Sequence, residues 1–356
     1  MSATPPKIAI AAGGTAGHVV PALAVADALR ARGAEVTFIG GERAEAELVP
    51  AAGYSFHRIA VAGLDRRNPL RAARAALLAV RALVRARALL GRLRPDAVMG
   101  GGGYVSGPVG LAAIVRGIPL VLTEADSHLG IANRALAPLA RRVCLAFPID
   151  GRNGSRYRVT GRPIPPPYED RAEARRRLGI ATGETCVLVF GGSLGARSIN
   201  LAALDAYAGA AFHVVHVCGR RDHPELSARP LPQGYDLRDY MDLGEFAQAL
   251  AAADLVVARA GGSLFEVVAH GTPAILVPYA HATADHQAAN ARWMERGGAA
   301  VVVPDAELSA ARLARETAAL LADPQRLRAM AAAARRLARP DAADAVADEL
   351  LQAARG

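Results

Sequence analysis

The sequence predicts an α/β protein with two domains, each built around a parallel β-sheet. Apolar, strand-like segments alternate with helical segments from end to end, which is typical of parallel sheets with crossover helices. The chain has 356 residues, more than a single core usually accommodates. A short apolar strand followed by a glycine turn and a helix occurs twice, at 7–18 and at 186–196. We expect the two domains to face one another across a cleft.

The first half of the chain shows this alternation in order. Each expected strand is a short apolar run, and each expected helix is a longer segment with a helical pattern of apolar residues. Strands are expected at 7–12, 35–39, 96–99, 118–122 and 142–146, and helices at about 18–32, 42–51, 69–91, 107–115 and 129–139.

A proline-dense stretch at 160–167 separates the two halves. Proline fixes φ and donates no backbone hydrogen bond, so this stretch continues neither a helix nor a central strand. We expect it to link the domains, with the first domain ending at residue 160. In the second half, strands are expected at 186–190, 212–217, 235–240, 255–257, 274–277 and 300–303. Helices are expected at about 196–208, 245–252, 262–269 and 284–296, and two arginine- and alanine-rich helices close the chain.

Positive charge is concentrated in one part of the chain. The formal net charge is +9, and ten arginines lie between Arg58 and Arg94 against one acid, Asp65. A positive face implies an anionic partner, such as a membrane surface or a phosphorylated substrate. We expect no nucleic acid, because no aromatic residues for base stacking are interleaved and no groove-reading motif is present.

The cysteines and the apolar runs indicate the compartment. Cys144, Cys186 and Cys218 lie far apart in apolar runs, which predicts buried, reduced thiols rather than disulfides or metal ligands. Lys7 interrupts the start of the chain, which predicts a strand and not a signal peptide, and no run of ~20 apolar residues would span a membrane. We expect a cytosolic protein that is able to contact a membrane.

The first glycine turn, Gly-Gly-Thr-Ala-Gly-His at 13–18, places a histidine at a helix start. The positive end of the helix dipole lowers the basicity of an imidazole there and favours a neutral ring that accepts a proton. His18 is therefore a candidate general base or acceptor-positioning residue. The alternative is a histidine that caps the helix or packs against it.

Two further sets of candidates follow expected strands of the first half. Four consecutive glycines at 100–103 suit either a ligand that approaches the backbone closely or a flexible turn. Tyr104 is able to hydrogen-bond a sugar hydroxyl or a phosphate, or simply to pack. Glu124 and Asp126 follow another strand, and ligands of parallel sheets gather at the carboxyl ends of strands. For Asp126, a cap on the helix near 129 is an equal alternative.

The second half offers two more glycine turns. The turn at 191–196 is the better phosphate cradle, because Ser193 offers a hydroxyl and no acid stands in the next helical turn. It matches neither the Walker loop, which needs a lysine, nor the dinucleotide fingerprint. In 259–266, Glu266 stands one turn into a helix, where a carboxylate accepts from two ribose hydroxyls. The alternative is a surface glutamate.

The last motif, at 278–290, combines polar side chains at a strand end and a helix start, which suits the recognition of sugar hydroxyls. His281, Asp285 and His286 would suit a metal. No third spaced set of ligands accompanies them, so no metal is expected.

Taken together, these motifs resemble those of the MurG family of bacterial glycosyltransferases, in order and over essentially the whole chain. The segments 13–18, 101–108 and 191–196 look like its three glycine loops, and 259–266 and 285–290 look like its donor-site signature. Each glycine loop alone is a weak signal, whereas five motifs in one order are highly specific.

The resemblance implies the GT-B fold, in which two Rossmann-like domains with parallel sheets face a cleft. A C-terminal helix of about 340–356 would join the N-terminal, acceptor-binding and membrane-associating domain, and 161–339 would bind UDP-N-acetylglucosamine. Residues 15–18 would line the acceptor side of the cleft, and three of them would also contact the donor. The implied donor-binding residues are Thr15, Ala16, Gly17, Asp126, Arg162, Ser193, Met241, Gly262, Ser263, Leu264, Phe265, Glu266 and Gln287. Gly102, Gly103 and Tyr104 are implied on the acceptor side.

The resemblance also implies the reaction. The 4-hydroxyl of the muramoyl sugar in a polyprenyl-diphosphate-linked muramoyl-pentapeptide attacks the anomeric carbon of N-acetylglucosamine with inversion, and UDP departs. We expect His18 to be the base, with Glu124 as a second catalytic residue. Ser193 would contact the diphosphate, Met241 the uracil, Glu266 the ribose and Gln287 the sugar. Helix dipoles and backbone N–H groups would stabilise the leaving diphosphate, so neither a metal nor another cofactor is expected.

The family gives the basic helix a role at the cytoplasmic face of the plasma membrane. Basic residues recur at helical spacing, and apolar residues recur on another face. Such a helix docks on anionic lipid, and each arginine contributes roughly 1 kcal/mol. A solvated arginine face on an ordinary packed helix is the alternative. The basic residues are Arg67, Arg71, Arg74, Arg81, Arg85 and Arg92, and the apolar ones are Leu70, Leu77, Val80 and Val84.

Several positions depart from the family pattern. Ala16 replaces a glycine, and 123–126 replaces His-Glu-Gln-Asn, so that Asp126 stands at the asparagine position. Arg162 replaces an asparagine and Pro165 replaces an arginine near the diphosphate, whose work Arg162 would take over from a shifted position. The alternatives are a transferase with another lipid acceptor, a UDP-N-acetylglucosamine 2-epimerase and a non-catalytic sensor. The epimerase would need more acids at the cleft than Glu124 and Asp126.

Overall fold

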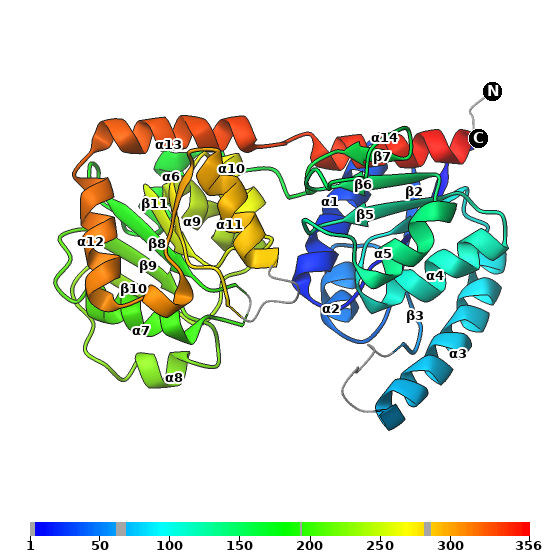
Figure 1. Ribbon diagram of the computed structural model, residues 1–356, viewed down its shortest axis with the longest axis horizontal. Coiled ribbons are helices and arrows are strands. Elements are labelled where there is room, and N and C mark those ends of the chain that lie inside the picture. Colours follow the sequence, from blue (N-terminus) through cyan, green and yellow to red (C-terminus); the bar gives the residue numbers. More distant parts are fainter. Residues whose placement is uncertain (1–3, 62–68, 193, 281–285) are drawn as a thin grey trace. The chain divides into compact units, whose positions relative to one another are not determined.

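The structure, a computed structural model, describes residues 4–61, 69–192, 194–280 and 286–356, without the side chains of 69–77 and 79. The chain divides into two compact units. The first is Met1–Pro165 with Arg339–Gly356, and the second is Pro166–Ala338. The division falls inside the proline-dense stretch, past the boundary expected after residue 160. Each unit has its own parallel sheet, so the prediction of two parallel-sheet α/β domains is confirmed (Figure 1).

The first unit contains a seven-stranded sheet in the order β3-β2-β1-β4-β5-β6-β7. The strands are β1 Lys7–Ala11, β2 Glu35–Gly40, β3 Ser55–Arg58, β4 Ala97–Gly100, β5 Leu120–Glu124, β6 Arg142–Leu145 and β7 Tyr157–Val159. The two edge strands β3 and β7 were not expected. They are short and only partly buried, so they lack the apolar run that marks the central strands.

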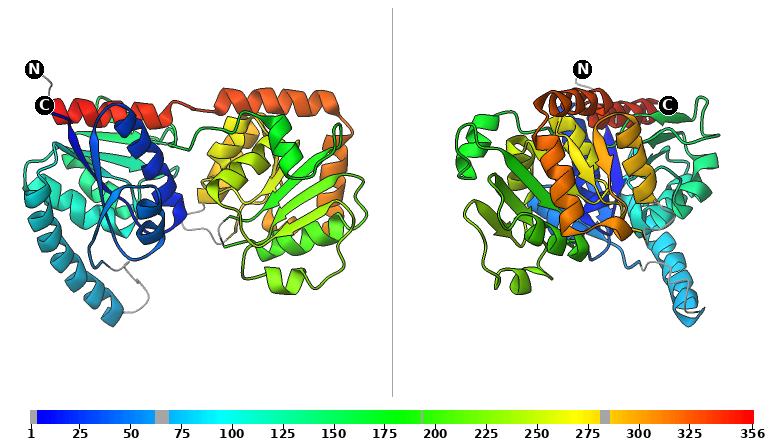
Figure 2. Two further views of the ribbon diagram at one scale, coloured as in Figure 1. Left: turned by 180° about the vertical axis from the view of Figure 1, so that it is seen from behind. Right: turned by 60° about the vertical axis from the view of Figure 1, so that its left-hand side comes forward.

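Helices cover both faces of this sheet. They are α1 Ala16–Ala31, α2 Ala44–Ala51, α3 Pro69–Leu93, α4 Gly103–Val115, α5 Ile131–Leu136 with a 3₁₀ turn Ala137–Leu139, and α14 Ala342–Arg355. Alternate residues of β1 face opposite ways. Ile8 and Ile10 pack in one core with α1, α2 and α14, whereas Ala9 and Ala11 pack in the other with α3, α4 and α5. The first turns of α3 extend beyond its neighbours (Figure 2).

The second unit contains a six-stranded sheet in the order β10-β9-β8-β11-β12-β13. The strands are β8 Cys186–Phe190, β9 His213–Val217, β10 Tyr235–Arg238, β11 Leu255–Ala258, β12 Ala274–Leu276 and β13 Ala300–Val302. The helices are α6 Arg171–Arg177, α7 Arg197–Ala206, α8 His223–Leu226, α9 Leu243–Ala252, α10 Leu264–His270, α11 His286–Arg296, α12 Ala310–Leu321 and α13 Pro324–Leu337.

The expectation of two closing helices is wrong, because three helices follow β13. The break between α12 and α13 is encoded locally. Asp323 accepts a hydrogen bond from the backbone N–H of Arg326, and Pro324 occupies the first helical position of α13. Pro340 stands between α13 and α14, and a proline interrupts helical hydrogen bonding.

The parallel arrangement brings the motifs together at one edge within each unit. In the first unit, 12–15, 101–102, 125–130 and 160–162 follow the carboxyl ends of β1, β4, β5 and β7. In the second, 191–196, 259–263 and 277–280 follow β8, β11 and β12. Both edges are therefore places where ligands of such sheets bind.

No helix within the described ranges combines the length and the apolar character that crossing a bilayer requires.

Candidate functional site

His18 lies in the first turn of α1, over the second glycine turn. The carbonyl of Thr15 accepts from the backbone N–H groups of His18 (3.0 Å) and Val19 (3.3 Å), which starts the helix. Gly102 has φ +86°, and a Cβ there would lie 2.8 Å from Nδ1 of His18. Only glycine therefore lets the imidazole lie against this backbone. The helix α4 begins at Gly103, before the expected residue 107, so the glycine run spans a strand end and a helix start.

The environment of His18 favours a neutral ring. Burial lowers the pKa of His18, and the Arg162 guanidinium lowers it further, whereas Asp126 and Glu45 act in the opposite direction. A neutral imidazole at neutral pH is able to take a proton from a hydroxyl. His18 therefore has the protonation state that a general base requires.

Glu45, in the first turn of α2, ties the two glycine turns of this unit together. It is fully buried. Its Oε2 accepts from the N–H of Gly14, and its Oε1 accepts from the N–H of Gly41 and the hydroxyl of Tyr104, each at 2.9 Å. The sequence offered no signal for this role, because an acid in the first turn of a helix is ordinarily a solvated residue that complements the helix dipole.

Tyr104 is half-buried beside this carboxylate. Burial and the hydrogen bond to Glu45 raise the pKa of Tyr104 to about 12. The guanidinium of Arg43 lies over its ring, 5.2 Å from the centroid. Its hydroxyl proton is donated to Glu45, so the structure favours the packing alternative for this side chain. The acceptor-side roles of Tyr104, Gly102 and Gly103 stay predictions.

Glu124 is the last residue of β5, and its hydrogen bonds hold the loop that follows. It is buried, and its oxygens accept from the N–H of Asp126 (3.2 Å), the N–H of Gly130 (2.8 Å) and the side-chain amide of Asn133 (2.9 Å). Burial raises the pKa of Glu124 despite these hydrogen bonds. The N-cap of α5 is Gly130, so the alternative of Asp126 as that cap is wrong. Asp126 is half-buried.

Arg162 is held against the first glycine turn. It is buried, and its Nη2 donates to the carbonyl oxygen of Gly17. Together with His18, Thr123 and Glu124, these two residues line a small cavity within the first unit. Thr15 and Gly17 are exposed, and Ala16 begins α1 half-buried. The donor roles expected for residues 15–17, Asp126 and Arg162 stay predictions.

In the second unit, the turn at 191–196 runs into α7, which has no acid in its first turn. The N–H of Gly195 donates to the carbonyl of Gly192 at 2.9 Å, and both glycines have positive φ. Ser193, the expected diphosphate contact, lies outside the described residues. The adjacent Leu194 is 77% exposed, so the tip of this turn is open to solvent.

A buried polar network lies beneath this turn. The Asn200 amide donates to the carbonyl of Cys218 (2.8 Å) and to Asp222 (2.9 Å), and its oxygen lies 3.1 Å from Nε2 of His216. Nδ1 of His216 lies 2.8 Å from the hydroxyl of Tyr235. The network joins α7 to the segments after β9, so it supports the turn. Its residues were not among the candidates, because they are scattered through apolar segments.

The donor-site signature forms the start of α10. Gly262 and Ser263 are partly exposed, whereas the side chains of Leu264 and Phe265 are buried, and Phe265 stacks on Trp293 with the centroids 5.5 Å apart. Glu266 follows, half-buried, in the first turn of the helix.

Other side chains brace this signature from neighbouring elements. The amide of Asn290 donates to the carbonyl of Ala260 at 3.1 Å. Arg259 donates to Asp305 at 2.7 Å and to Ser198 at 2.8 Å, so it is committed to packing within the unit. These bonds hold the α10 start against α11, the 305–307 turn and α7.

Gln287 and Met241 flank this region. Gln287 Oε1 accepts from the N–H of Tyr279 at 2.9 Å, which orients the start of α11 toward the end of β12. Met241 is buried just before Asp242, which caps α9 in a capping box with Glu245. The donor roles of Met241, 262–266 and Gln287 stay predictions.

Within the described residues, no group of three or more His, Cys, Asp or Glu side chains is arranged to hold a metal ion. His281 and Asp285, two of the three side chains considered for a metal, lie outside them. Cys144, Cys186 and Cys218 are free and buried, as expected.

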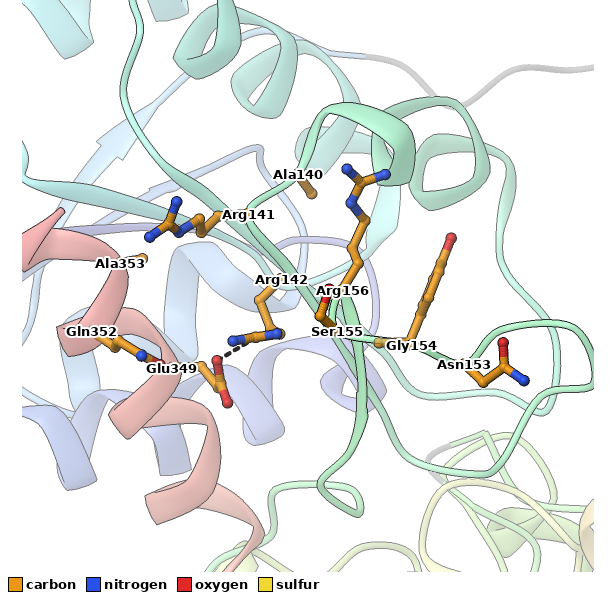
Figure 3. A pocket seen from close by; sticks show the side chains of 11 residues that line it. Ala140, Arg141, Arg142, Asn153, Gly154, Ser155, Arg156, Glu349, Gln352 and Ala353 are labelled. Carbon is orange, nitrogen blue, oxygen red and sulfur yellow. Dashed lines mark hydrogen bonds and ion pairs between the residues drawn. The ribbon is translucent and has the colours of Figure 1, made fainter.

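A second pocket, of about 640 Å³, opens at the amino-terminal ends of the strands of the first sheet, where β6 and β7 begin (Figure 3). Arg141, Arg142 and Arg156 line it, and Nε of Arg142 donates to Glu349 Oε2 at 2.5 Å. Arg158 donates to the other Glu349 oxygen. Arg141 and Arg156 are exposed surface cations. This pocket is therefore separate from the glycine turns, which lie at the carboxyl ends of the strands.

Two family models match the chain. Residues 8–145 match the glycosyltransferase family 28 N-terminal domain, and residues 186–346 match the glycosyltransferase family 28 C-terminal domain. The first match covers the two glycine turns of the first unit, and the second match covers the 191–196 turn and the donor-site signature of the second unit.

Known proteins match over the whole chain. The chain is 44% identical to the UDP-N-acetylglucosamine–N-acetylmuramyl-(pentapeptide) pyrophosphoryl-undecaprenol N-acetylglucosamine transferase of Moorella thermoacetica, over 97% of this chain and 98% of the relative. The crystal structure of Acinetobacter baumannii MurG matches with a TM-score of 0.77 and 30% identity, over 98% of this chain and 100% of that one. A UDP-GlcNAc 2-epimerase from Neisseria meningitidis matches with a TM-score of 0.66 at 13% identity, over 97% of this chain and 100% of that one, which shows a shared fold alone.

Proposed function

Because the chain belongs to the MurG family of glycosyltransferases, we propose that it transfers N-acetylglucosamine from UDP-N-acetylglucosamine to a polyprenyl-diphosphate-linked muramoyl-pentapeptide. The full-length likeness to curated transferases carries this reaction. The feature of the site that supports it most directly is His18, a half-buried imidazole with a lowered pKa at a helix start.

In this mechanism, His18 takes the proton of the muramoyl 4-hydroxyl as that oxygen attacks the anomeric carbon. The bond from this carbon to the diphosphate oxygen breaks, its electron pair leaves with UDP, and the configuration at carbon inverts. Backbone N–H groups in the 191–196 and 261–263 turns stabilise the leaving diphosphate without a metal. Ser193 assists through its hydroxyl.

The second unit recognises the donor through its remaining groups. Glu266 binds the ribose hydroxyls, the backbone at Met241 binds the uracil, and Gln287 binds the sugar. Support for this assignment comes from the bracing of the α10 start by Asn290 and of the α11 start by the Gln287–Tyr279 contact. Held backbone N–H groups bind an anion without having to be ordered first.

Mixing the protein with UDP-N-acetylglucosamine and a short-chain lipid-linked muramoyl acceptor tests the reaction. UDP release that requires the acceptor is the expected result. Epimerisation of the donor without acceptor would instead assign a 2-epimerase, and donor binding without turnover would assign a sensor. Either result would overturn the transferase.

The proposal extends to docking on the anionic cytoplasmic face of the plasma membrane. The side of α3 that faces the unit is apolar, with Ala82, Ala86 and Leu90 fully buried. On the outward side, Val80 and Val84 are 59% and 64% exposed. Exposed arginines accompany them, namely Arg81, Arg85, Arg87 and Arg92. Of the residues expected to dock, Arg67 lies outside the described residues, as do the side chains of Leu70, Arg71, Arg74 and Leu77.

We expect the neighbouring helix α4 to contribute to docking as well. It packs along α3 and exposes Leu111 and Val115. Apolar side chains among arginines on two adjacent helices are suited to an interface of lipid headgroups and acyl chains. A substrate with a polyprenyl tail would be met at that surface.

A further inference from the structure

We propose that Glu45 is a positioning residue of the transfer reaction, which holds the first glycine turn against the second so that His18 stands in its working position. This inference rests on the proposed function. Glu45 would act through His18 and would touch neither substrate, because its side chain is fully buried.

The carboxylate of Glu45 uses both oxygens to join three segments. Oε2 accepts from the N–H of Gly14 in the first turn, and Oε1 accepts from the N–H of Gly41 after β2 and the hydroxyl of Tyr104 in α4, all at 2.9 Å. Burial by itself raises the pKa of Glu45, but these hydrogen bonds outweigh it, so its pKa lies below the ordinary value. The group is therefore a charged acceptor, which makes each of the three bonds stronger than a neutral one.

The surrounding backbone is shaped to this carboxylate. A Cβ on Gly13 would lie 2.8 Å from Glu45 Oε1, and one on Gly40 would lie 2.7 Å from Glu45 Cγ. A Cβ on Gly103 would lie 1.8 Å from the carbonyl oxygen of Gly13. The two glycine turns therefore touch backbone to backbone next to Glu45, and a shift of one displaces the other.

His18 depends on both turns. Its backbone follows the first turn, and its imidazole lies against Gly102 in the second. The charged groups that act on it are Arg162, Asp126 and Glu45. Loss of Glu45 would loosen the contact between the turns and remove a negative charge near the ring. Misplacement of a base by about 1 Å costs on the order of 100-fold in rate.

Glu45→Gln tests the proposal, because it keeps the shape of the side chain but presents an NH₂ group to N–H donors. We expect kcat to fall about 10- to 100-fold with the KM for UDP-N-acetylglucosamine within about threefold of wild type. In the pH profile of kcat/KM, the acidic limb should move to lower pH, because the His18 pKa falls when a nearby negative charge is removed. Titration of the His18 ring by NMR should show the same downward shift.

Glu349→Gln is the matched control. Glu349 is a second buried carboxylate of the same unit, but its partners Arg142 and Arg158 lie where β6 and β7 begin. This variant should lower the unfolding midpoint while kcat and the acidic limb stay within about twofold of wild type. If Glu45→Gln loses only stability, with kcat and the His18 titration unchanged, or if Glu349→Gln loses equal activity, the inference is wrong.

Tyr104→Phe keeps the test open if Glu45→Gln does not fold. It removes one of the three hydrogen bonds and should lower kcat about 3- to 10-fold, whereas Tyr54→Phe, which removes a comparable bond to Asp27 (2.6 Å), should leave kcat unchanged. Equal activity in both variants would overturn the role of Glu45. A wild-type protein without transfer activity would overturn the proposed function alone, because the NMR titration still reports whether Glu45 acts on His18.

Discussion

Nη2 of Arg162 donates a hydrogen bond to the carbonyl oxygen of Gly17, the residue before His18. This contact brings a buried guanidinium from the segment after β7 to the first turn of α1. The positive charge lowers the pKa of His18 in addition to the larger effect of burial. Arg162 thereby helps to keep the imidazole neutral. Because Arg162 replaces the asparagine of the family pattern, this departure favours the neutral form of His18, the expected base.

Arg162→Gln should shift the pH dependence of the reaction. Glutamine removes the charge and still offers an amide that is able to donate to Gly17. Because Arg162 lowers the pKa of His18, its loss should raise that pKa, and the acidic limb of kcat/KM should move to higher pH. A pH series of initial rates measures this shift. Arg158→Gln, which neutralises an exposed arginine paired with Glu349, should leave the limb in place. If the limb stays in place in both variants, the charge of Arg162 does not set the pKa of His18.

His18→Ala should abolish most of the turnover and spare donor binding. Loss of a general base typically costs about 10²- to 10⁴-fold in rate. The donor-binding groups proposed in the second unit are untouched, so the calorimetric Kd for UDP-N-acetylglucosamine should change little. His57→Ala, in the edge strand β3, serves as the control. Turnover at the wild-type rate in the His18 variant would show that another group takes the proton.

Glu266→Ala should weaken the binding of UDP. A charged carboxylate that accepts from two hydroxyls contributes about 1.5 to 3 kcal/mol, which corresponds to roughly 10- to 100-fold in Kd. UDP lacks the sugar, so its affinity reports on the nucleoside contacts alone. Glu295→Ala removes an exposed glutamate from α11 of the same unit and should not alter the affinity. Equal Kd values for the two variants would place the ribose elsewhere.

Most central elements were predictable because they bury fully apolar runs. The strand expected at 186–190 agrees with β8, Cys186–Phe190, in which every residue is buried. The edge strands β3 and β7 were not predicted because each has only three or four residues and one solvated side. In so short a strand, the alternation of apolar and polar residues is not detectable. Propensity does not reveal edge pairing, which depends on a neighbour that is distant in the chain.

The glycine turns were also predictable from the local sequence, whereas the side chains that hold them in place were not. A glycine run after an apolar strand marks close approach, and Gly102 indeed lies against the His18 ring. Glu45 and Asn200 hold these turns from other elements, and each resembles an ordinary helical residue in sequence. Their roles arise from contacts with residues that are distant in the chain. Glu45 and Gly14 are 31 residues apart, and Asn200 and Cys218 are 18 residues apart, so a local sequence pattern does not reveal these contacts.

Arg81→Gln/Arg85→Gln should weaken binding to anionic vesicles. Each arginine near such a surface contributes about 1 kcal/mol, so the double variant should lose roughly 30-fold in partitioning onto phosphatidylglycerol vesicles at low salt. Arg326→Gln/Arg328→Gln removes the same charge from an exposed stretch of α13 and should bind like the wild type. Sedimentation with vesicles of phosphatidylglycerol or phosphatidylcholine measures both. Equal losses in the two double variants would indicate a general charge effect instead of docking through α3.

His216 should make the protein lose stability as the pH falls. Burial lowers the pKa of His216 from about 6.5 to about 4, so the unfolded chain takes up a proton that the folded chain excludes. The stability is therefore complete above pH 6.5 and declines as the pH falls from there toward 4. The full pKa shift corresponds to a loss of about 3 kcal/mol in the free energy of unfolding.

Urea unfolding of the wild type and of His216→Asn at pH 7 and pH 4.5 tests this. The variant should be less stable at pH 7, because Tyr235 and Asn200 lose a partner, and it should lose less free energy between the two pH values. His57→Gln, at a half-buried site on β3, should keep the pH dependence of the wild type. If His216→Asn and the wild type lose the same free energy, proton uptake at His216 does not govern acid unfolding. The network beneath the 191–196 turn would then be stable without a neutral imidazole.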